Sequence, residues 1–135
     1  MCEAVLTGNL RRVQGKVRLP AVPDSVPRAR ALVRAAAARH GIEDDAAWAL
    51  MLATTEAVSN AVEHGSGGAI GLAIESNDGE LSVEVSSSGP FRVELPDQAG
   101  PHRGRGLPLM AEVVDRLHLE PGEEQTRVRF VKRAA

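Results

Sequence analysis

The sequence predicts an α+β two-layer sandwich, in which one mixed, mostly antiparallel sheet carries its helices on one face. Short alternating apolar segments come mostly in pairs joined by turn residues, which is typical of antiparallel hairpins. The helical segments stand apart from these pairs, and no repeat or linker divides the 135 residues. Hairpins that are separate from helices favour one sheet covered by a helical layer.

The first third of the chain predicts a strand followed by a helix. Residues 13–19 alternate in polarity and stop at Pro20, as expected of a strand. Apolar residues then recur at helical spacing, after Asp24 or Ser25 as a cap. Gly41 ends this helix, because glycine readily takes the left-handed conformation that follows many helices.

The middle of the chain predicts a second helix and then a hairpin. The helix begins near Asp44, whose carboxylate suits the positive end of a helix, and ends at His64 before a glycine-rich stretch. Two strands are expected at residues 69–75 and 80–85. The intervening residues 77–79 read Asn-Asp-Gly, which is a strong signal for a hairpin turn.

The last third predicts a turn-rich segment, a third helix and a final hairpin. Residues 86–106 are rich in Ser, Gly and Pro, and the helix that follows them is expected to end near Arg116. Residues 117–120 and 126–132 are expected to pair as strands across a Pro-Gly turn. The predicted order is therefore β-α-α-β-β-loop-α-β-β.

Composition and charge limit the classes of protein that the chain can represent. Hydrophobic residues make up 43% and charged residues 25% of the sequence, and no apolar run reaches the ~20 residues of a membrane span. A single cysteine excludes an internal disulfide and a cysteine-based zinc site. We expect a cytoplasmic protein with a flexible leader at residues 1–12 and a single domain at residues 13–133.

The net charge of −2 hides an uneven distribution. Residues 1–40 carry a charge of +6, whereas residues 41–135 carry −8. This difference fits an ordinary solvated surface or a basic face that docks an acidic partner. Nucleic acid is not an expected partner, because aromatic residues are only 2% of the chain and the basic residues are scattered. A membrane is not expected either, because no apolar run is long enough to span one.

One helical segment carries the strongest signal for a ligand site. Glu56, Asn60 and His64 are four residues apart, so they form one polar stripe about 12 Å long. Helical geometry puts small residues beside this stripe and larger apolar residues opposite, where they can face the sheet. The small residues are Ala49, Ala53 and Ala57, and the larger ones are Met51, Val58 and Val62. The pattern predicts an open floor for a ligand; the simpler alternative is a solvent-exposed helix face.

The residue types of this stripe suit a hydrated magnesium ion. Mg²⁺ prefers oxygen ligands and keeps several waters, so the amide of Asn60 and the carboxylate of Glu56 are suitable neighbours. A carboxylate close to that ion could also deprotonate an attacking hydroxyl.

A second signal is the sequence Gly104-Arg105-Gly106-Leu107, directly before the third predicted helix. Glycines let the backbone approach an anion, and a helix start offers free N–H groups and a positive dipole end. These residues therefore predict a phosphate site, with an ordinary turn as the alternative.

Together these residues resemble the GHKL ATPase superfamily, and within it the small anti-sigma-factor serine kinases of bacterial stress and sporulation control. The resemblance covers residues 17–130 and implies a Bergerat-type sandwich. Residues 56–64 are similar to the N-box of this family. The resemblance implies that Glu56 is the catalytic base, that Asn60 coordinates Mg²⁺, and that His64 closes the motif.

The same resemblance implies ATP and Mg²⁺ as cofactors. The segment from Gly104 to Leu107 is similar to the second glycine box, which holds the phosphates and anchors one end of the ATP lid. Residues 92–103 would form that lid. The partners implied are a STAS-domain anti-anti-sigma factor as substrate and a sigma factor, with a homodimer as the typical assembly.

The first glycine box departs from the family pattern. Ser87 stands where the family has an Asp that receives the adenine amino group, Gly89 keeps the first glycine, and Phe91 replaces the second. A serine can still accept a hydrogen bond, and Phe91 can either stack on the purine or block the pocket. Two functions therefore stay open: an ATP-dependent serine kinase, or a degenerate binding module that sequesters a sigma factor or other regulator without ATP.

Overall fold

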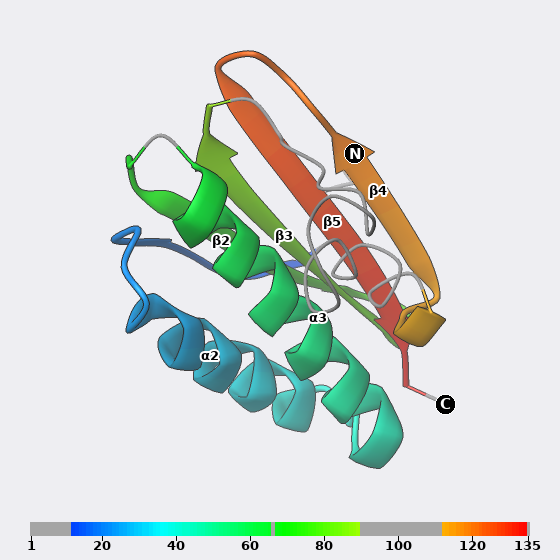
Figure 1. Cartoon of the computed structure of the whole chain (residues 1–135). Helices are drawn as coiled ribbons and strands as arrows, with labels where there is room; N and C mark the ends of the chain where they lie inside the picture. The colour runs from blue at the N-terminus through cyan, green and yellow to red at the C-terminus, as the bar shows by residue number, and fades with distance from the viewer. Residues whose placement is uncertain (1–11, 66, 90–111, 135) are drawn as a thin grey trace.

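A five-stranded sheet with two helices on one of its faces forms the structure (Figure 1). The computed structural model describes residues 12–65, 67–89 and 112–134. The helices are α2 (Ser25–Arg39) and α3 (Asp44–His64). The strands are β1 (Arg12–Leu19), β2 (Ile70–Asn77), β3 (Glu80–Ser88), β4 (Arg116–Glu120) and β5 (Gln125–Arg133). The predicted α+β sandwich is confirmed.

The strands are arranged in the order β1-β2-β3-β5-β4. Each pairing between the described strands is antiparallel, so the parallel pair that a mixed sheet would contain is not among them. The last hairpin inserts its second strand next to β3, which leaves β4 at one edge and β1 at the other.

Strand alternation separates the sheet into an apolar face and a polar face. The apolar face is covered by α2 and α3 (Figure 1) and forms the core, in which Phe130 is fully buried. Its buried strand residues include Leu72, Ile74, Leu81, Val83, Val85 and Val128. The opposite face carries no helix of the described part of the chain (Figure 1).

The first helix begins and ends close to the predicted residues. The side chain of Asp24 makes no capping hydrogen bond. Instead the buried hydroxyl of Ser25 donates to the Pro20 carbonyl at 2.5 Å, which ties the helix to the preceding turn. Gly41 adopts the predicted left-handed conformation with a φ of 72°, and the Ile42 amide then donates to the Ala37 carbonyl at 2.9 Å.

The turn between β2 and β3 is a tight two-residue connection. Asn77 pairs with Glu80, and the two residues between them, Asp78 and Gly79, have φ values of 48° and 79°. Positive φ at both central positions is typical of a type I′ turn, whose twist matches that of the strands. The Ala134 amide donates to the Gly79 carbonyl at 2.9 Å, so this turn is also fixed to the end of β5.

The predicted third helix falls mainly outside the described residues. Of this helix, the structure describes only Glu112 and Val113, and both are helical. Arg116 is already the first residue of β4. The helix therefore ends at Val113, slightly before the predicted end near Arg116, because Arg116 already pairs with Val131 of β5. Neither α2 nor α3 is long and apolar enough to cross a membrane.

We expect the substitution Gly79→Ala to lower the free energy of unfolding by about 1–2 kcal/mol, because a Cβ makes the left-handed conformation costly. Gly15→Ala is the matched control, since Gly15 lies in β1 without a positive φ and an added Cβ would meet nothing within 4 Å. Urea denaturation of both variants measures the difference. An equal loss in the two variants would contradict the assignment of the turn.

Candidate functional site

Helix α3 places Glu56, Asn60 and His64 along one flank, at the border between its buried side and solvent. All three side chains are half-buried. The four-residue spacing turns each of them about 40° further around the helix than the one before. The predicted stripe therefore exists, and its residues are partly shielded rather than freely solvated.

The carboxylate of Glu56 sits in an environment that favours its protonated form. Burial, and after it the negative charge of Glu63, raises the pKa of Glu56 above its ordinary value of 4.5. Within the described part of the chain, no hydrogen bond or ion pair holds this carboxylate. A half-buried carboxylate with a raised pKa is a suitable proton acceptor.

The other two side chains of the stripe differ in their surroundings. The side chain of Asn60 makes no hydrogen bond to any described residue, so its amide oxygen is available to a ligand. His64 is 20% exposed, and its Nε2 lies 3.6 Å from Oε1 of Glu63. His64 therefore belongs to the protein's own polar contacts at the end of the helix, whereas Asn60 is the better candidate for a ligand.

The predicted floor of alanines is wrong. Ala49, Ala53 and Ala57 are 4%, 0% and 3% exposed, and the last two belong to the core cluster. Of the residues expected to face the sheet, Val58 is fully buried, but Met51 and Val62 are only partly so.

The rotation of α3 explains this error. The buried side of the helix is centred on Leu50 and Thr54, both 0% exposed, and the Thr54 hydroxyl donates to the Leu50 carbonyl at 2.7 Å. Small side chains beside this centre let the helix lie close to its neighbours. Helix α2 packs along the other side, where Nη1 of Arg30 donates to Oγ1 of Thr55 at 3.4 Å. The stripe therefore borders the core and has no alanine floor.

The end of β3 brings the first glycine box to the same face of the sheet. Ser87 is half-buried and, by strand alternation, lies on the helix-covered face with Val85. Gly89 is buried with a φ of 91°. Its amide donates to the Glu124 carbonyl at 2.8 Å, and its carbonyl accepts a 3.0 Å hydrogen bond from Oγ1 of Thr126. These contacts fix the backbone where the strand ends.

The C-terminal end of α3 and the end of β3 lie against each other. A Cβ on Gly65 would lie 3.5 Å from the Ser88 carbonyl oxygen, and a Cβ on Gly68 would lie 2.6 Å from the Ser88 hydroxyl. This close approach explains the glycine at position 68, whereas at position 65 a Cβ would collide with the Ala61 carbonyl oxygen of α3 at 2.5 Å. The sequence analysis did not assign these roles. The structure therefore brings the stripe of α3 and the Ser87–Gly89 segment together at one end of the sheet.

The remaining predicted site residues lie outside the described residues: Phe91, Gly104, Arg105, Gly106, Leu107 and the lid at residues 92–103. In the part of the chain that is described, no group of three or more His, Cys, Asp or Glu side chains could hold a metal ion. A magnesium ion at Asn60 would need most of its ligands from a nucleotide and water, which is a usual arrangement for this ion.

Comparison with known proteins identifies the type of domain. Residues 19–132 match the histidine kinase-like ATPase domain family. No curated protein matches the chain significantly. Among solved structures, the RsbU and RsbW domains of a Mycobacterium tuberculosis protein superpose with a TM-score of 0.71 at 23% identity, over 88% of this chain. This chain spans only 32% of that chain's length. A chain of the SiaB–SiaC complex from Pseudomonas aeruginosa superposes with a TM-score of 0.61 at 15% identity, over 95% of this chain and 94% of the other.

We expect Glu56→Gln to raise the melting temperature at pH 7. A raised pKa means that ionisation of Glu56 opposes folding, and the neutral amide removes that cost. Below pH 4.5 the carboxyl is protonated in both the folded and the unfolded state, so the advantage of the variant should disappear. Thermal denaturation at pH 7 and at acid pH measures the effect, with Glu123→Gln in the exposed β4–β5 turn as the control. A gain that persists at acid pH would argue against burial as its cause.

Proposed function

Because the chain belongs to the histidine kinase-like ATPase family, we propose that it is an ATP- and Mg²⁺-dependent serine kinase that regulates an anti-sigma pathway. The observation that carries this proposal is the flank of α3, where Glu56 and Asn60 are half-buried and without hydrogen bonds to described residues. Two unpaired polar groups beside the core are suited to a ligand that carries its own charges and metal ion.

Asn60 is the residue that would hold the magnesium ion. Its side-chain oxygen is of the ligand type that Mg²⁺ prefers, and one protein ligand suffices when phosphates and waters supply the others. Bound ATP supplies the phosphoryl group. Gly104 to Leu107 would provide the backbone amides and a positive charge that neutralise the phosphates.

Glu56 would act as the base. Its carboxylate accepts the proton of the substrate serine hydroxyl as the oxygen becomes the nucleophile, and the raised pKa of Glu56 makes it a stronger acceptor. His64, one turn after Asn60, would help to close this end of the helix through its contact with Glu63.

The substrate and partners that we propose are proteins. Residues 17–130 resemble anti-sigma-factor kinases, so we propose a STAS-domain anti-anti-sigma factor as the phosphorylated protein and a sigma factor as the sequestered one. One of the similar structures is itself a complex of two proteins, SiaB and SiaC. A homodimer and a cytoplasmic location, where ATP is abundant, complete the proposal.

The second candidate function is a binding module that sequesters a sigma factor without nucleotide. It is favoured by Ser87, which is uncharged where the family has an Asp for the adenine amino group. Hydrogen bonds to charged groups are the stronger ones, so this replacement weakens the adenine contact by about 1–2 kcal/mol.

Calorimetric titration of Mg·ATP separates the two functions. The kinase proposal expects micromolar binding that is lost in Asn60→Ala and retained in Ser59→Ala, a control on the neighbouring face of α3. No heat at millimolar ATP would leave only the binding module. If ATP binds, Glu56→Ala should still bind it but should transfer less than about 1% of the phosphate to a STAS-domain partner, because the base is absent.

The adenine contact can be tested by restoring the charge. We expect Ser87→Asp to tighten ATP binding by about tenfold, which corresponds to roughly 1.4 kcal/mol. Ser86→Asp is the matched control, because the next residue of a strand points to the opposite face of the sheet. Equal effects of the two substitutions would show that Ser87 does not contact the adenine.

A further inference from the structure

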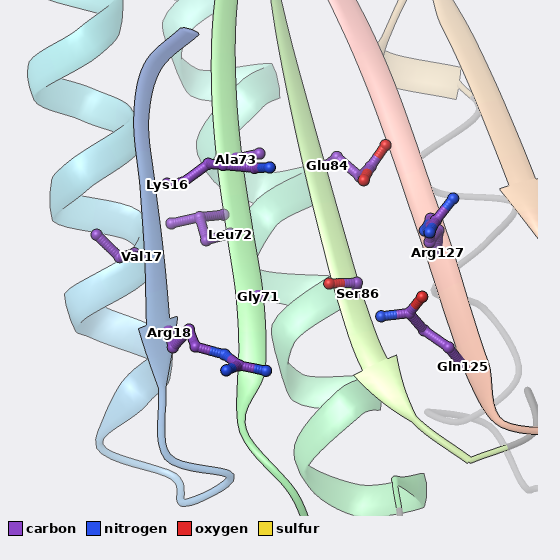
Figure 2. A pocket seen from close by; sticks show the side chains of 10 residues that line it. All are labelled: Lys16, Val17, Arg18, Gly71, Leu72, Ala73, Glu84, Ser86, Gln125 and Arg127. Atoms are coloured by element: carbon purple, nitrogen blue, oxygen red, sulfur yellow. The ribbon is translucent and has the colours of Figure 1, made fainter.

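The sheet face opposite the helices carries a hollow of about 400 Å³ that the sequence analysis did not predict. Figure 2 shows it from the side on which no helix lies, with residues of β1, β2, β3 and β5 around it. Its floor is made of three small residues, Gly71, Ala73 and Ser86. We call this hollow the sheet trough.

The strand register explains why the trough is deep in the middle and walled at both ends. Arg18 of β1 pairs with Gly71, which pairs with Ser86, which in turn pairs with Arg127 of β5. One row across four strands thus reads arginine, glycine, serine, arginine. A Cβ on Gly71 would collide with the Ser86 hydroxyl. No side chain larger than that of glycine therefore fits at this point, and the backbone of β2 itself forms the floor.

The charge of the trough is positive. Lys16, Arg18 and Arg127 line it, together with a single carboxylate, that of Glu84. Lys16 and Arg18 make no ion pair with any described residue. Arg127 contacts Glu120 at 3.3 Å, but both side chains are at least half exposed, so this ion pair is weak.

The other end of the same sheet face is neutralised by the protein itself. Glu80 accepts hydrogen bonds from Arg116 at 2.9 and 3.2 Å and from Arg133 at 3.0 Å. The hydrogen bond from Arg116 is the main cause of the lowered pKa of Glu80. Arg116 and Arg133 are therefore neutralised by a shared carboxylate. The cations that line the trough have no such buried or multiply hydrogen-bonded partner among the described residues.

We propose that the sheet trough binds an extended acidic segment of a partner protein. The two arginines at its ends belong to strands three spacings apart, about 14 Å, and an extended chain covers about 13 Å in four residues. A segment that crosses the strands with carboxylates about four residues apart and small residues between them therefore matches both the charge and the floor. Gln125 and Ser86 can hydrogen-bond its backbone amides.

A peptide fits this trough better than a nucleic acid. The residues that line it include no aromatic side chain on which a base could stack. The trough also lies on the opposite face of the sheet from α3, which carries Glu56 and Asn60, so the proposal does not depend on nucleotide binding.

Fluorescence anisotropy with the full chain tests this proposal, using a fluorescein-labelled peptide GSEGSGEGS and its glutamine counterpart GSQGSGQGS at low salt. We expect saturable binding of the acidic peptide only. Arg18→Glu should weaken it by about tenfold, and Glu84→Gln should tighten it by about two- to threefold. Ala73→Tyr should abolish it by filling the floor without changing the charge. Arg34→Glu, which makes the same charge change on the exposed surface of α2, should have less than a twofold effect.

Several results would overturn the proposal. One is the absence of saturable binding at about 1 mM peptide, which corresponds to only about −4 kcal/mol. Another is equal weakening by Arg18→Glu and Arg34→Glu, which would show attraction by net charge alone. A single-stranded oligonucleotide that displaces the peptide at lower concentration would assign the trough to nucleic acid. Sedimentation showing a dimer that only Arg18→Glu and Ala73→Tyr dissociate would assign it to a second copy of the chain.

Discussion

The burial of one face of an antiparallel sheet under two helices is the constraint on which the rest of the structure depends. Side chains alternate along a strand. When an apolar residue packs under α2 and α3, the residues before and after it in the strand therefore point to the open face. Phe130 and Val83 are paired and fully buried, and the residues on either side of each of them point away from the core. A slip of one residue in any strand would exchange the two faces, so the core fixes the register of the whole sheet.

This constraint also determines what each face can do. On the covered face, the buried residues of α3 occupy about half of its circumference, and its polar stripe lies at the edge of this buried side. At that rim, partial burial raises the pKa of Glu56, while Asn60 remains accessible. On the open face, most residues between the core positions lie outside the core, although Ser82 and Val131 are buried there. Small residues can therefore alternate with cations there, as they do between Arg18 and Arg127.

The elements of the fold could be predicted from the sequence because local signals specify them. The Asn-Asp-Gly sequence at residues 77–79 predicts the hairpin turn, since positive φ is cheap only for such residues. Gly41 likewise predicts the end of α2. The rotation of α3 could not be predicted, because alanines on several sides fit either a ligand floor or a close helix contact. The trough was missed for a related reason: it joins residues from four strands, and only the register shows that Arg18 and Arg127 lie in one row.

The two parts of the candidate nucleotide site differ in how far the sequence could predict them. The stripe on α3 follows from the helical repeat alone, so the sequence could predict that it exists. Its partial burial depends on how α3 packs, and only the structure shows this. The Ser87–Gly89 end of the candidate site depends on where β3 stops relative to the end of α3, and the helical repeat alone does not determine this. Gly68 lets the segment after α3 approach Ser88 closely, because a Cβ at this position would lie 2.6 Å from the Ser88 hydroxyl. The contacts of Gly89 with Glu124 and Thr126 fix the backbone beside Ser87, so the end of β3 determines where the short Ser87 side chain lies.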